Sequence, residues 1–163
     1  MARQEKKPCM VYFFDLPLHR TKLKFKKMNT EKFSGTLLKV AKKQEKVDIL
    51  INKLLSSEAE KISPADKLAM QAFCCAMMAD GSKNFMQIKQ YINECCEYLN
   101  KAFTIDSQSY VCHLVRILIE KNMHDATFIS HIHEDTAFLC SYHAEVEDGY
   151  KQLANYATED IKS

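Results

Sequence analysis

Residues 63–81 read SPADKLAMQAFCCAMMADG and contain the clearest structural signal in the chain. Serine, then proline, then an acid in the first turn is typical of a helix start, because the serine oxygen accepts a free backbone N–H and proline has none to satisfy. Residues 68–79 are uncharged, and Gln71 is their one strongly polar side chain. A helix without a polar face is usually buried. We therefore predict a central helix over 64–79 that ends at Gly81, where glycine can take the left-handed backbone conformation.

Helical periodicity continues before this segment. Asn29 or Thr30 can cap the first helical region, and the sequence leaves open whether residues 31–56 form one bent helix or two short ones. The apolar stripe expected along it consists of Phe33, Leu37, Leu38, Ala41, Val47, Leu50, Ile51, Leu54 and Leu55.

Three further helical patterns follow the central segment. Ser82 can cap the first of them, and its expected core stripe is Phe85, Ile88, Ile92, Cys95 or Cys96, Leu99 and Phe103. Asp106 can cap the second, which has an apolar side and an opposite side with His113, Arg116 and Glu120. The third runs from residue 125 to about 160. Its expected break is Gly149.

The composition favours helices as well. Glycine and proline each occur only 3 times, too few for the turns of a many-stranded β fold. The predicted fold class is all-α, an antiparallel helical bundle of about five to seven helices with a short N-terminal extended arm or two-stranded ribbon. The helical bundle domain covers residues 29–163, and the basic arm covers residues 1–28.

The cysteines and the apolar segments indicate a compartment. The chain has 7 cysteines, an odd number, with adjacent pairs at 74–75 and 95–96. Neighbours on a helix point about 100° apart and cannot easily form a disulfide. The N-terminal region lacks the apolar core of a signal peptide, and no uncharged stretch approaches the roughly 20 residues of a membrane-spanning helix. We expect free thiols, a cytoplasmic location and no membrane span.

Charge distinguishes the two ends of the chain. Residues 1–28 carry eight Lys or Arg and two acids, whereas residues 120–163 carry nine acids and three Lys or Arg. A β-prone run at 11–14 and period-two alternation at 22–26 predict an extended ribbon in the arm. The candidate interaction residues of this arm are Arg20, Lys22, Lys24, Phe25, Lys26 and Lys27.

Two roles for the arm remain open. Its lysines and Phe25 could contact phosphates and stack on a base, which would indicate binding to nucleic acid or another acidic surface. Alternatively, the lysines protect a strand edge from aggregation, or the arm covers its own acidic bundle. We favour the internal role because aromatic side chains are costly to leave in water. The pI near 8.1 also lies below the range typical of nucleic-acid modules.

Sequence motifs predict no catalytic, cofactor-binding or metal-binding residues. The glycines are too far apart for a phosphate-binding loop, and neither C-x-x-C nor H-E-x-x-H occurs. The one metal-like cluster consists of His131, His133, Glu134, Asp135, Cys140 and His143. Of these, we consider only Cys140 and His143, one helical turn apart, as joint ligands of one ion, and we expect them to pack beside the apolar stripe instead. We expect packed, protonated thiols at Cys74, Cys75, Cys95 and Cys112.

The leading hypothesis is a non-enzymatic helical module that binds another protein, as an adaptor, a regulator or a pathogen protein acting on host factors. It depends on the lack of a catalytic motif and on an excess of methionine, which suits adaptable apolar surfaces. A homodimer is an open alternative for the partner. The alternative functions are binding of nucleic acid or an acidic surface through the arm, and an enzyme with a Cys/His site outside the known motifs.

Overall fold

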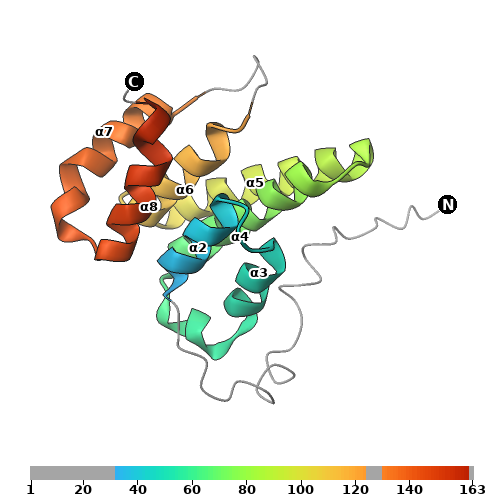
Figure 1. Cartoon of the computed structure of the whole chain (residues 1–163), viewed down its shortest axis with the longest axis horizontal. Coiled ribbons are helices and arrows are strands. Elements are labelled where there is room, and N and C mark those ends of the chain that lie inside the picture. The colour runs from blue at the N-terminus through green and yellow to red at the C-terminus, as the bar shows by residue number, and fades with distance from the viewer. Residues whose placement is uncertain (1–31, 124–129, 162–163) are drawn as a thin grey trace.

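The computed structural model describes residues 32–123 and 130–161, and every regular element in these ranges is a helix (Figure 1). The order is α2 (Phe33–Ala41), α3 (Val47–Leu55), α4 (Pro64–Gly81), α5 (Phe85–Ile105), α6 (Tyr110–Glu120), α7 (Ile132–Tyr142) and α8 (Asp148–Thr158), with short 3-10 helices at Ser57–Lys61, His143–Glu145 and Glu159–Ile161. The predicted all-α bundle is confirmed for this part of the chain. The predicted arm lies outside the described residues.

Helix α4 begins as predicted. The Ser63 hydroxyl accepts a hydrogen bond from the Asp66 backbone N–H at 3.1 Å, and Pro64 is the first helical residue. The buried residues of α4 lie between Ala65 and Cys75. The helix contacts α3, α5 and α6. The end of α4 differs from the prediction, because its last turns are partly exposed and Gly81 keeps a negative φ as the final helical residue.

Helix α6 shares the centre of the bundle with α4. All of its residues except Arg116 are buried, and it contacts α4, α5, α7 and α8. Ser109 caps it, not the predicted Asp106, because the Ser109 hydroxyl accepts the Cys112 N–H at 3.1 Å. The bundle is therefore built around two helices, and the prediction of a single central helix was incomplete.

The region before α4 forms two helices, which answers the question that the sequence left open. The chain turns between them at Lys43, whose φ of 57° is the one positive value among the described residues. Both helices place their apolar side on the core through Leu37, Val40, Leu50, Ile51, Leu54 and Leu55.

The C-terminal end of α4 and the N-terminal end of α5, in green to yellow-green, project together beyond the other helices in Figure 1. Helix α5, with 21 residues, is the longest helix of the described chain. Asn84 caps it in place of the predicted Ser82, since the Asn84 side-chain oxygen accepts the N–H of Met86 at 3.0 Å. The predicted core stripe is wrong at this end. Phe85 is 76 % exposed and Ile92 is 37 % exposed, because α4 packs against the opposite side of α5, the side that carries Glu94.

The C-terminal region breaks at His143–Glu145 and not at Gly149, which lies inside α8. Glycine is required there for another reason. A Cβ atom on Gly149 would overlap the hydroxyl of Ser34 and lie 3.1 Å from the Ser34 Cβ. The missing side chain thus lets α8 approach α2, which it contacts in the bundle. No described helix is long and apolar enough to span a membrane.

Candidate functional site

The seam between α6 and α7 contains three of the buried polar residues of the described chain, His113, Glu120 and Asp135. His113, Arg116 and Glu120 follow one another at spacings of three and four along α6, so they share one face of that helix. Helix α7 packs on this face and buries only Asp135 and Leu139. The seam therefore joins two helices largely through charged groups.

Asp135 is the centre of the seam and has 0 % exposure. Its carboxylate accepts hydrogen bonds from Arg116 Nε at 2.7 Å and Arg116 Nη2 at 2.6 Å. The Nδ1 atom of His113 lies 2.6 Å from the same carboxylate. Burial alone would raise the pKa of Asp135, but the hydrogen bonds from Arg116 and His113 outweigh it and hold the pKa below the ordinary value. Asp135 is therefore ionised at neutral pH.

His113 is enclosed on both sides of its ring. It is 5 % exposed, and its second nitrogen, Nε2, lies 3.0 Å from the backbone oxygen of Ser107. The ring of Phe138 stacks on it with centroids 3.8 Å apart, and the ring of Phe103 meets it edge-on at 5.1 Å. Arg116 lies over the face of Phe103 with its Cζ 4.1 Å from the centroid. Both ring nitrogens are therefore engaged, and neither is free to accept a proton from a substrate.

A second histidine and carboxylate pair lies at the end of the seam. The side chain of Glu120, the last residue of α6, is 1 % exposed. It accepts the backbone N–H of His131 at 2.6 Å and lies 2.7 Å from His131 Nδ1. His131 directly precedes α7, so this pair fixes the position at which that helix begins.

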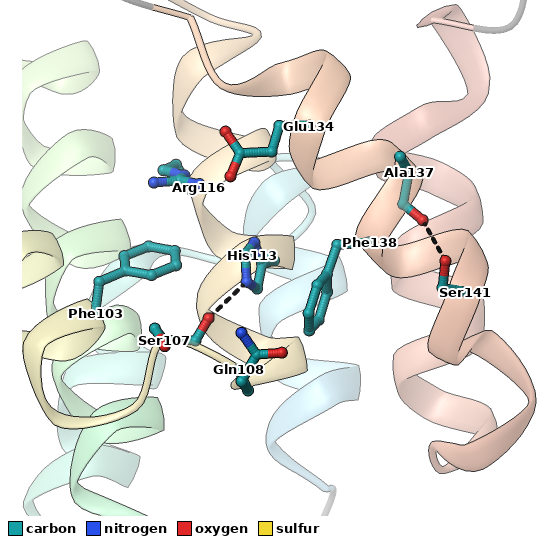
Figure 2. A pocket seen from close by; sticks show the side chains of 9 residues that line it. All are labelled: Phe103, Ser107, Gln108, His113, Arg116, Glu134, Ala137, Phe138 and Ser141. Carbon is teal, nitrogen blue, oxygen red and sulfur yellow. Dashed lines mark hydrogen bonds between the residues drawn. The ribbon is translucent and has the colours of Figure 1, made fainter.

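A cavity of about 520 Å³ opens at the seam beside His113 and Arg116. The side chains around it are Phe103, Ser107, Gln108, His113, Arg116, Glu134, Ala137, Phe138 and Ser141. Figure 2 shows the two phenylalanine rings on opposite sides of His113, with Glu134 near Arg116. The volume is in the range of small-ligand sites. Helix α7 supplies four of the nine lining residues, so the cavity exists only while α7 is docked.

A second candidate surface lies on the projecting end of α5. Apolar residues recur along this helix at alternating steps of three and four, the repeat of a helix-packing seam; they are Phe85, Ile88, Ile92, Cys95, Leu99 and Ala102. The last three are buried in the bundle and Ile88 is half-buried, whereas Phe85 and Ile92 are exposed. Met86, beside Phe85, is 70 % exposed. The apolar seam is therefore continuous, but the described chain covers only its C-terminal half.

The buried thiols are as predicted. Burial raises the pKa of Cys95 to about 12 and that of Cys112 to about 11, and it raises the pKa values of Cys74 and Cys75 further. These four thiols are therefore protonated at neutral pH.

The residues of the metal-like cluster have different surroundings in the structure. Cys140 is exposed, so the prediction that it packs beside the stripe is wrong. His143 Nδ1 is instead 3.4 Å from the Tyr110 hydroxyl. In the described ranges, no group of three or more His, Cys, Asp or Glu side chains is placed to hold a metal ion.

Sequence reasoning found half of the charged seam. It placed His113, Arg116 and Glu120 together on one helix face, but it grouped Asp135 and His131 with metal-like residues and missed that they are the partners of that face. The predicted interaction residues lie outside the described residues: Arg20, Lys22, Lys24, Phe25, Lys26 and Lys27.

Comparison with protein-family models, with curated proteins and with solved structures gives no match. The fold and the two surfaces define a helical bundle that has a charged interior seam and an apolar helix end with no covering partner within the described chain. Any function must therefore be inferred from these two features.

Proposed function

We propose that this chain is a non-enzymatic interaction module that binds an amphipathic helix of another protein along the N-terminal half of α5. The observation that supports the proposal is the apolar repeat from Phe85 to Ala102, which is buried at one end and exposed at the other. Exposed large apolar side chains that lie together are typical of protein-binding sites. A repeat with steps of three and four matches a helix better than it matches an extended peptide.

The composition of this end suits such a partner. Met86 on α5 is joined by Met77 and Met78 in the last turns of α4, both partly exposed. Methionine side chains are flexible and adapt to the partner's shape. The ring of His113 is enclosed and the buried thiols are protonated, so the proposal assigns no catalytic role to these side chains.

The test compares three forms of the full chain as bait in a lysate: wild type, Phe85→Asp, and Ile49→Asp. Ile49 is 46 % exposed on α3 and serves as the matched control, because the same apolar-to-acid change is made away from α5. Burying a large apolar side chain contributes about 1.5–3 kcal/mol, so we expect Phe85→Asp to weaken the complex by at least about tenfold. A synthetic peptide of the captured segment should become helical when it binds.

Circular dichroism first establishes that both variants fold. Proteins retained equally by all three forms would contradict the proposal. Self-association of the wild type that Phe85→Asp abolishes and Ile49→Asp preserves would also contradict it, because the occupant of α5 would then be a second copy of this chain.

A further inference from the structure

The attachment of α7 differs from that of the other helices. Its buried side chains are one carboxylate, Asp135, and one apolar residue, Leu139. Phe138 adds a partly buried ring that stacks on His113, so the apolar contacts of α7 and its hydrogen bonds meet at the same charged group of residues. A contact of this kind depends on the protonation state of its members.

The geometry determines how many protons His113 needs. Asp135 is ionised and accepts two hydrogen bonds from Arg116, so its oxygen cannot donate to His113 Nδ1. The backbone oxygen of Ser107 cannot donate to Nε2 either. Both ring nitrogens must therefore donate, and only the doubly protonated imidazolium has two N–H groups.

We propose that His113, Arg116 and Asp135 form a proton-dependent latch, which keeps α7 on α6 while His113 is an imidazolium and releases α7 as the pH rises. Loss of one proton would bring a nitrogen lone pair against an oxygen, either that of Asp135 or that of Ser107. The other charged groups around the latch are Glu134 on α7 and Glu120 at the end of α6. The Phe103 and Phe138 rings that enclose His113 do not titrate.

The direction in which pH changes the docking of α7 follows from His113 and Asp135. Docking that needs the imidazolium is present while His113 holds both ring protons and is lost when one of them leaves, so it weakens as the pH rises. Asp135 has a lowered pKa, so its contribution is present above the ordinary carboxyl range and is lost only in acid. The latch is therefore closed between these limits and opens on the alkaline side by losing a single proton.

His131 gives an internal contrast. Its Nδ1 can donate to Glu120, and its other ring nitrogen makes no hydrogen bond within the described residues. The neutral ring satisfies this geometry, so His131 needs no second proton. Only His113 should couple its charge to the docking of α7, and release would remove the α7 wall of the cavity.

The test is hydrogen exchange of the full chain from pH 6 to 9, corrected for the intrinsic pH dependence of exchange. We expect the protection of α7 amides to fall by up to about tenfold per pH unit, the limit for one proton, while α4 protection stays constant. His133→Gln, at an exposed histidine on α7, should behave as wild type. His113→Gln should remove the pH dependence.

A second measurement does not depend on a variant that folds. The ¹⁵N chemical shifts of the His113 imidazole in the wild type should show two protonated nitrogens at pH 6. A neutral ring at that pH would overturn the proposal. So would α7 protection that stays constant from pH 6 to 9, or an unchanged pH dependence in a folded His113→Gln variant.

Discussion

Helices α4 and α7 are attached to the same central helix, α6, by opposite means. Helix α4 buries seven apolar residues between Ala65 and Cys75, whereas α7 buries one leucine and one carboxylate. The stabilisation that comes from buried apolar surface does not depend on pH, and it is the sum of many small contacts. The attachment of α7 is concentrated in a few short hydrogen bonds, so a single chemical change can undo it. This difference predicts how strongly substitutions in α4 and in the α7 seam reduce the stability of the bundle.

The largest effect is expected in the apolar helix. Ala72 is fully buried in α4, and Ala72→Asp would place an unpaired charge among apolar side chains. The cost is several kcal/mol against a total stability of about 5–15 kcal/mol, so we expect loss of the folded state. Circular dichroism and size-exclusion chromatography measure it. Asn93→Asp, on the exposed face of α5, is the control; a folded Ala72→Asp protein with an unchanged melting temperature would show that α4 is not central.

The next effect is expected at the seam of α7. Asp135→Ala would leave Arg116 and the charged His113 without their shared carboxylate, and removing one partner of a buried ion pair costs about 3–5 kcal/mol. Urea unfolding gives the difference. Glu134→Ala, at the exposed neighbouring position, should cost less than about 0.5 kcal/mol. Equal losses for the two variants would mean that the charged seam does not stabilise the fold.

The sequence could predict the fold wherever a pattern is local. The start of α4 and its burial were predictable because the cap and the uncharged stretch lie within one segment. The projecting end of α5 was not, since Phe85 and Ile92 have the periodicity of a core stripe whether or not this chain covers them. Gly149 was taken for a break, because its neighbour Ser34 is more than a hundred residues away in the sequence.

The candidate site was less predictable than the fold for a related physical reason. Periodicity places His113, Arg116 and Glu120 on one helix face, but it says nothing about which face packs against them. Ion pairs between helices have no period, so Asp135 could be assigned to Arg116 only from the tertiary structure. The exposure of Cys140 likewise depends on how α7 is rotated when it docks.

Replacing all three charged residues of the latch with apolar ones tests the comparison between α4 and α7 further. We expect the triple variant His113→Leu, Arg116→Met, Asp135→Leu to be as stable as the wild type or more stable by up to about 1–4 kcal/mol, because apolar replacements often avoid the cost of burying ions. Its stability should also lose the alkaline dependence that His113 confers. Thermal unfolding at pH 6 and pH 9 measures both quantities. A triple variant less stable than Asp135→Ala would contradict this expectation.

The smallest effect on stability is expected from the N-terminal caps of α4 and α7. Ser63 caps α4 through its hydroxyl, whereas the residue before α7 makes no side-chain cap. Ser63→Ala should cost about 1 kcal/mol, since the Asp66 N–H loses its acceptor. Ser63→Asp, which keeps an acceptor, should restore most of it. Equal melting temperatures for wild type and Ser63→Ala would show that packing alone positions α4.

The contact between α2 and α8 has a consequence for the order of events during synthesis. The Tyr156 hydroxyl donates to the backbone oxygen of Ala41 at 3.4 Å, and 115 residues separate the two positions. A ribosome that adds about 5–20 residues per second needs roughly 6–23 s to cover this distance. During that interval Leu37 and Val40 on α2 lack the α8 side of their final packing. The nascent chain therefore presents an apolar helix well before α8 is made, when a chaperone could bind it, and can close the bundle only after α8 has left the ribosome.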